Sequence, residues 1–243
     1  MTIKMYLSAK HCYRLCCLLQ PWVLFLGIMA GIIGLLDGLV WAPADYQQGE
    51  VYRILFIHVP AAVLSLGVYC IMALAAVIYL IWKIRVVDVI AKVSAPVGAL
   101  FTLLTLITGS LWGKPTWGTY WIWDARLTSE LILFFIYCGI MAIRSAFTEP
   151  FLAAQASGVM TLVGLVNIPI VHYSVVWWNT LHQSASILKW GKPSMVPSML
   201  SPLLWMLLAY SFYYLAILLV NVRYELLKQA KNTTWVHTLF NKN

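Results

Sequence analysis

The sequence predicts an all-α, polytopic membrane protein with six transmembrane helices and with both termini in the cytoplasm. Hydrophobic residues make up 62% of the 243 residues, charged residues make up only 10%, and the mean hydropathy is +0.84. Soluble domains carry roughly 25% charged residues, so a soluble domain of useful size does not fit. We expect residues 1–243 to form a single six-helix membrane domain. The net charge of +8 is attributed to membrane-flanking residues and not to nucleic-acid binding.

Six apolar runs are long enough, or nearly long enough, to cross a bilayer, which takes about 20 residues. Lipid offers no hydrogen-bond partner to the backbone, so each run must be helical. The predicted spans are residues 21–41, 52–82, 94–112, 128–143, 152–177 and 199–222.

Lys and Arg are distributed unevenly among the segments that connect these runs. With the N-terminus inside, the inner segments hold eleven basic residues and the outer segments hold five. Cytoplasmic segments of membrane proteins carry the excess of Lys and Arg. The distribution therefore predicts that both termini are cytoplasmic.

The first predicted span, residues 21–41, carries a face of small residues. Gly27, Gly31, Gly34 and Gly38 recur at intervals of three or four residues, which places them on one side of a helix. Small residues at this spacing let another transmembrane helix approach closely. We expect this face to pack against a neighbouring span.

The second and fifth spans each contain a histidine near a proline. His58 lies two residues before Pro60, and His172 lies three residues after Pro169. Proline removes a backbone donor, so both helices are expected to bend. An ionisable residue within a span is a functional candidate by default, although a histidine satisfied by a neighbouring helix explains His58 equally well. His172 lies deeper and is interpreted as structural.

The third and fourth spans are joined by a tryptophan-rich segment at about residues 112–126. Its four tryptophans are Trp112, Trp117, Trp121 and Trp123. Tryptophan is common at the lipid–water boundary, and an ordinary aromatic belt is the alternative explanation. If the segment is helical, Trp117, Trp121 and Asp124 share one face. Such a face would form an aromatic shelf suited to a flat, apolar molecule.

Two histidines, His58 and His182, lie near these tryptophans on separate outer elements. Two imidazoles can ligate one haem iron from both faces, whereas zinc would need further ligands that no close cluster supplies. Arg53 and Arg126 lie on the same side and suit haem propionates, although contact with lipid phosphate explains them equally well. On a regular helix Arg126 would point away from Trp117, so either the segment is irregular or Arg126 has another partner.

The residues of these segments resemble a known family. Residues 117–124 match the WGxxWxWD signature of haem-handling proteins in cytochrome c biogenesis. The histidine before Val-Pro in the second span and the Trp-Trp-Asn-Thr-Leu-His-Gln run at 177–183 are similar to the cytochrome c maturation protein C family, CcmC. The resemblance covers nearly the whole chain.

The resemblance implies that the protein holds haem b at the periplasmic face of the bacterial inner membrane, with His58 and His182 as axial ligands of the iron. The residue pattern and the resemblance together give the following expected haem-contacting set: His58, His182, Trp112, Trp117, Gly118, Trp121, Trp123, Asp124, Arg53, Arg126, Trp177 and Trp178. The implied partners are the haem chaperone CcmE, the ATP-binding-cassette subunits CcmA and CcmB, the small single-span subunit CcmD, and membrane lipid.

Haem binding and transfer without catalysis has two alternatives. A haem–thioether ligase of the same motif class is expected to be longer, with more spans and extra histidines. A permease for a small soluble substrate predicts paired broken helices in two repeated halves, and the sequence has no such repeat. Gly109-x-x-x-Gly113-Lys114-Pro115 falls one residue short of a phosphate loop, and proline occupies its Ser/Thr position.

Overall fold

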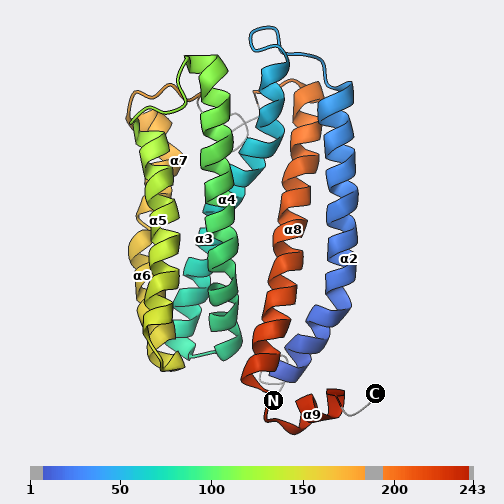
Figure 1. Cartoon of the computed structure of the whole chain (residues 1–243), viewed down its shortest axis with the longest axis vertical. Coiled ribbons are helices and arrows are strands. Elements are labelled where there is room, and N and C mark those ends of the chain that lie inside the picture. Colours follow the sequence, from blue (N-terminus) through green and yellow to red (C-terminus); the bar gives the residue numbers. More distant parts are fainter. Residues whose placement is uncertain (1–7, 184–193, 241–243) are drawn as a thin grey trace.

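The computed structural model describes residues 8–183 and 194–240, and within these ranges the regular structure is helical (Figure 1). The elements are α2 (Ala9–Leu36), the π-helix η1 (Asp37–Trp41), the 3₁₀-helix η2 (Glu50–Ile54), α3 (Leu55–Trp82), α4 (Arg85–Trp117), α5 (Ala125–Ala146), α6 (Pro150–Gly164), α7 (Asn167–Trp177), α8 (Pro197–Gln229) and α9 (Thr234–Phe240).

The prediction of an all-α protein with six membrane spans is confirmed. Six stretches in the described residues are long and apolar enough to cross a membrane: Ala9–Trp41, Glu50–Trp82, Arg85–Trp117, Ala125–Ala146, Pro150–Trp177 and Pro197–Gln229. The helices extend past the predicted apolar runs, because a helix continues into polar residues once it has left the hydrocarbon. The start of α2 and the end of α8 lie at one end of the bundle (Figure 1).

Gly27, Gly31 and Gly34 of the first span pack against the last span, and Gly38 packs against Phe56 of α3, so the predicted packing against neighbouring spans is confirmed. Helices α2 and α8 run side by side along one side of the bundle (Figure 1). A Cβ on Gly27 would lie 3.1 Å from Phe212 Cβ, and a Cβ on Gly34 would lie 2.9 Å from Met206 Sδ. Glycine is therefore required for the observed distance between the two backbones.

Two buried tyrosines join α3, α5 and α6 in the middle of the bundle. The Tyr137 hydroxyl donates to the Ser65 carbonyl at 2.8 Å, and the Tyr69 hydroxyl donates to the Thr161 carbonyl at 2.9 Å. The two rings meet edge to face at 5.2 Å. These contacts fix α3, which carries His58 two turns before Ser65.

The fifth span is interrupted close to its proline. Helix α6 ends at Gly164 and α7 begins at Asn167. Pro169 cannot donate a hydrogen bond to the Leu165 carbonyl, so the break falls where the missing bond would have been. Asn167 Nδ2 instead donates to the Ser129 carbonyl at 2.9 Å and ties α7 to α5. By contrast, α3 continues as a helix through Pro60.

Candidate functional site

The tryptophan-rich segment is a helix end followed by a loop, and the expectation of one helical face is wrong beyond Trp117. Helix α4 ends at Trp117, where Gly118 adopts a left-handed conformation with φ +80° and donates its N–H to the Lys114 carbonyl at 3.0 Å. Glycine is the residue that most readily ends a helix in this way. The chain is then irregular up to Asp124, so Trp121 does not share a helix face with Trp117.

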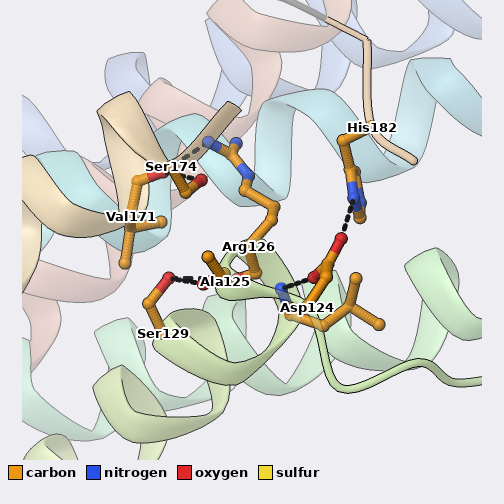
Figure 2. Close-up of polar contacts among 8 residues, drawn as sticks. Asp124, Ala125, Arg126, Ser129, Val171, Ser174 and His182 are labelled. Carbon is orange, nitrogen blue, oxygen red and sulfur yellow. Dashed lines mark hydrogen bonds and ion pairs between the residues drawn. The ribbon is translucent and has the colours of Figure 1, made fainter. Parts of the chain in front are cut away.

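Asp124 has two structural roles at the start of α5. Its Oδ1 accepts the Leu127 N–H at 2.8 Å and caps the helix. Its Oδ2 lies 3.4 Å from His182 Nδ1, and Figure 2 shows the carboxylate directed at the imidazole. Asp124, the N-cap of α5, thus also contacts the loop that follows α7.

The surroundings of His182 favour a neutral imidazole. Burial lowers the pKa of His182 from its ordinary value, Asp124 opposes this shift, and Arg126 adds to it. The ring packs edge-on against Trp117, with 4.7 Å between ring centroids. Because the carboxylate of Asp124 accepts, Nδ1 carries the hydrogen and Nε2 keeps its lone pair. A neutral histidine with a free ring nitrogen is the form that binds a metal.

His58 is oriented in the same way by α4. Its Nδ1 lies 3.0 Å from Thr108 Oγ1, whose own hydrogen is donated to the Leu104 carbonyl at 2.6 Å. The hydroxyl oxygen must therefore accept from Nδ1, which again leaves Nε2 with its lone pair. Trp112 packs edge-on against the ring at 5.7 Å. Gly109 leaves room for the ring, because a Cβ there would lie 3.0 Å from His58 Cε1.

One cavity of about 540 Å³ brings the two histidines together. Of the residues expected to contact haem, it is lined by His58, His182, Trp112, Trp117 and Arg126. The rest of the wall is mostly apolar, with Leu55, Val59, Leu66, Ile168, Val175 and Leu203 among its residues. Small-molecule binding pockets typically have volumes of about 300–1,000 Å³ and apolar walls with a few polar groups, and this cavity has both properties.

The donor set fits haem better than a bare metal ion. Among the described residues, no group of three or more His, Cys, Asp or Glu side chains could hold a metal. Two histidines suffice for a haem iron, because the porphyrin supplies the remaining ligands. The cavity thus offers two oriented imidazoles within an apolar enclosure.

Arg126 and Trp121 lie beside the two histidines. Arg126 Nη1 donates to the Val171 carbonyl at 2.7 Å and so has a partner other than the tryptophan segment (Figure 2). Trp121, Arg126 and both histidines line a small adjoining pocket of about 30 Å³. The Trp121 indole N–H is buried without a hydrogen-bond partner in the described residues, which leaves a donor available beside the histidines.

Several residues of the expected set do not line the cavity. Arg53 donates to the Glu50 carboxylate and to the Gly38 and Ala42 carbonyls, and thereby ties η2 to the end of the first span. Trp123 is 78% exposed. The other five that lie outside the wall of this cavity are Gly118, Trp121, Asp124, Trp177 and Trp178, of which Trp121 lines the smaller pocket.

Sequence reasoning missed four residues that the structure places at the site. Thr108 orients His58. Gln48 accepts the Trp112 indole N–H at 2.8 Å. Glu130 lines the smaller pocket, and His172, interpreted as structural, lines the larger one. A carboxylate inside a predicted span was a visible signal, whereas Gln48 and Thr108 had no distinguishing pattern.

Comparison with known proteins gives a consistent result over nearly the whole chain. The family model for heme exporter protein C, CcmC, matches residues 2–237. Heme exporter protein C of Haemophilus influenzae is 48% identical over 234 residues, which cover 96% of this chain and 95% of the relative. The Escherichia coli K12 protein of the same name is 44% identical over 230 residues, covering 95% and 93%. A putative cytochrome c biosynthesis ccmC-like mitochondrial protein of Marchantia polymorpha is 49% identical over 177 residues, covering 72% and 74%. The chain therefore belongs to the heme exporter protein C family, CcmC.

Proposed function

We propose that this protein holds haem b at the periplasmic face of the bacterial inner membrane and transfers it to the haem chaperone CcmE. The observation that carries the proposal is that His58 and His182 line one cavity, each with Nδ1 facing an oxygen acceptor and with no hydrogen bond between Nε2 and another described residue. Metal-ligating histidines almost always donate their other ring N–H to a protein acceptor. Neither histidine is proposed as a catalyst.

Apolar contact is expected to provide most of the affinity for the porphyrin. Removing apolar area from water contributes about 25 cal/mol per Å², and Trp112 and Trp117 add broad aromatic surfaces to the cavity wall. Among the described residues, Arg126 is the one Arg or Lys that lines the cavity, so we assign it to the propionates in preference to Arg53. In this proposal Asp124 contributes by orienting His182.

The proposed orientation places this cavity outside the cytoplasm. Trp112 and Trp117, which line the cavity, lie at the end of α4, and the end of α4 lies opposite the start of α2 and the end of α8 (Figure 1). The excess of Lys and Arg assigns the latter end to the cytoplasm. The long apolar faces of the bundle are then left for lipid and for the subunits CcmA, CcmB and CcmD.

A direct transfer assay tests this function. Purified protein loaded with haem is mixed with CcmE in detergent, the two proteins are separated, and the haem on each is measured by its optical spectrum. We expect haem to move to CcmE in proportion to the haem first bound at the site. If all the haem stayed on this protein at every CcmE concentration, the carrier function would be wrong.

Thr108→Val tests the orientation of His58 with almost no change in side-chain shape. The variant removes the acceptor of the Nδ1 hydrogen, and we expect haem to bind about 10–100-fold more weakly, the usual effect of losing such a partner. Thr108→Ser restores the hydroxyl and should bind haem as the wild type does. Titration of haem into each purified variant measures the difference. Equal affinity of the Val and Ser variants would contradict the role of Thr108.

A further inference from the structure

A second cavity lies at the other end of the bundle from the histidines. It has a volume of about 370 Å³ and is enclosed by α3, α4, α5 and α6. None of its lining residues belongs to the cavity that contains His58 and His182. Its function is therefore separate from direct contact with haem.

The cavity is lined by both apolar and charged residues. Met72, Ala95, Ile140 and Ala154 are among the apolar residues that line it. The charged residues that line it are Asp88, Lys92 and Arg144. Each cation is paired with a carboxylate, Arg144 with Asp88 and Lys92 with Glu225, so the N–H donors that these ion pairs leave unused are what an anionic head with an apolar body would meet.

Arg144 is held in place and keeps donors for a further ligand. Its Nη2 donates to Asp88 Oδ2 at 2.5 Å, and its Nη1 donates to Ser157 Oγ at 3.2 Å. A guanidinium has five N–H donors, so these two contacts leave others for an anion. The Arg144 side chain is only 16% exposed. A phosphate would therefore meet a fixed, largely desolvated cation.

Lys92 provides the second cation. Its Nζ donates to Glu225 Oε2 at 2.6 Å, which uses one of its three hydrogens. Lys92 lies one turn after Asp88 on α4, so both face the same side of the helix. The two carboxylate contacts position the cations, and the cavity lies between these charges and the apolar wall.

We propose that this cavity binds one anionic phospholipid, with the phosphate on Arg144 and Lys92 and part of an acyl chain along Met72, Ile140 and Ala154. Basic pockets between transmembrane helices on the cytoplasmic side bind anionic head groups, and that leaflet carries the anionic lipids. The proposal rests on the orientation proposed above. It does not rest on haem binding at His58 and His182.

Native mass spectrometry of the full-length protein tests the proposal. The protein is incubated with dioleoyl phosphatidylglycerol or with dioleoyl phosphatidylcholine, which has the same chains and no net charge. We expect the phosphatidylglycerol adduct to be retained and the phosphatidylcholine adduct to be lost. Arg144→Gln should weaken phosphatidylglycerol binding by about tenfold, the effect of one charge-assisted contact. Arg223→Gln is the matched control, because Arg223 lies at the same end over the Tyr13 ring and outside the cavity.

Ala154→Leu gives a test that leaves the Arg144–Asp88 ion pair in place. Ala154 is 2% exposed and lines the cavity, so the larger side chain should fill it and reduce phosphatidylglycerol binding. The lipid proposal is overturned if both cavity variants bind phosphatidylglycerol as the wild type does, or if the two lipids bind equally. It is also overturned if added haem displaces phosphatidylglycerol from the wild-type protein and displaces it less effectively from Arg144→Gln. The haem spectrum of each sample reports separately on the histidine site.

Discussion

Replacing either His58 or His182 with alanine is expected to reduce the haem content of the purified protein by at least about tenfold. Removing an outer partner of a metal ligand usually costs about 10–100-fold in affinity, and removing the ligand itself should cost no less. Each histidine lines the same cavity with its Nδ1 engaged, so in the proposed site the loss of either leaves one axial position of the iron without a protein ligand. Haem content is measured by pyridine haemochrome spectra at equal protein concentration.

Two further variants make this result specific. His237→Ala removes a histidine from α9, far from the cavity in sequence and outside its lining, and should retain haem as the wild type does. His172→Ala removes the third histidine of the cavity wall. If His172→Ala abolished haem binding while His58→Ala or His182→Ala did not, the assignment of the axial pair would be wrong.

Trp117→Ala is expected to weaken haem binding by roughly 30-fold, which corresponds to the loss of about 2 kcal/mol from an aromatic anchor in a binding site. The indole lines the cavity and packs against the His182 ring at 4.7 Å. The variant therefore removes apolar contact with the porphyrin and the surface that supports one ligand. Trp117→Phe keeps an aromatic ring and should retain most of the affinity. Equilibrium haem titration measures both changes.

Trp123→Ala is the matched control within the same segment. Trp123 is 78% exposed and does not line the cavity, so its removal should change haem affinity by less than about threefold. Transfer to CcmE is measured on the same samples, because an exposed indole on this loop is available to a partner protein. Equal losses of haem affinity in Trp117→Ala and Trp123→Ala would contradict the distinction between the cavity wall and the outer loop.

Hydrophobicity was sufficient to predict the number and order of the spans, but not their ends. A lipid-exposed backbone in an apolar run must satisfy its own hydrogen bonds as a helix, so each apolar run predicts one helical span. The ends depend on capping and on contacts outside the lipid. Helix α4 begins at Arg85 and not at residue 94, and α8 continues to Gln229 beyond the predicted end at residue 222.

The break in the tryptophan-rich segment was accessible from the sequence. Gly118 follows the last helical tryptophan, as a left-handed C-terminal cap requires, and Asp124 stands where α5 needs an N-cap. The irregular segment also explains why Arg126 need not point away from Trp117 as it would on one regular helix. Arg126 lies on α5, and its guanidinium donates to the Val171 carbonyl on α7.

The convergence of the two histidines depends on long-range packing that no local pattern specifies. His58 is placed by α3, and His182 is placed by the loop after α7 through its contact with Asp124. The positions of the two histidines on outer segments beside the tryptophans predicted the pair, and the family resemblance implied their role as axial ligands. Arg53 matched the expected side of the membrane as well as Arg126 did, but the fold directs it to the Ala42 carbonyl.

The electron paramagnetic resonance spectrum of ferric haem bound to the purified wild-type protein tests the central claim most directly. Two imidazole ligands predict a low-spin, six-coordinate iron, and His58→Ala and His182→Ala should each convert the remaining haem to a high-spin form. A high-spin wild-type spectrum, or a low-spin spectrum unchanged in both variants, would contradict ligation of the haem iron by His58 and His182.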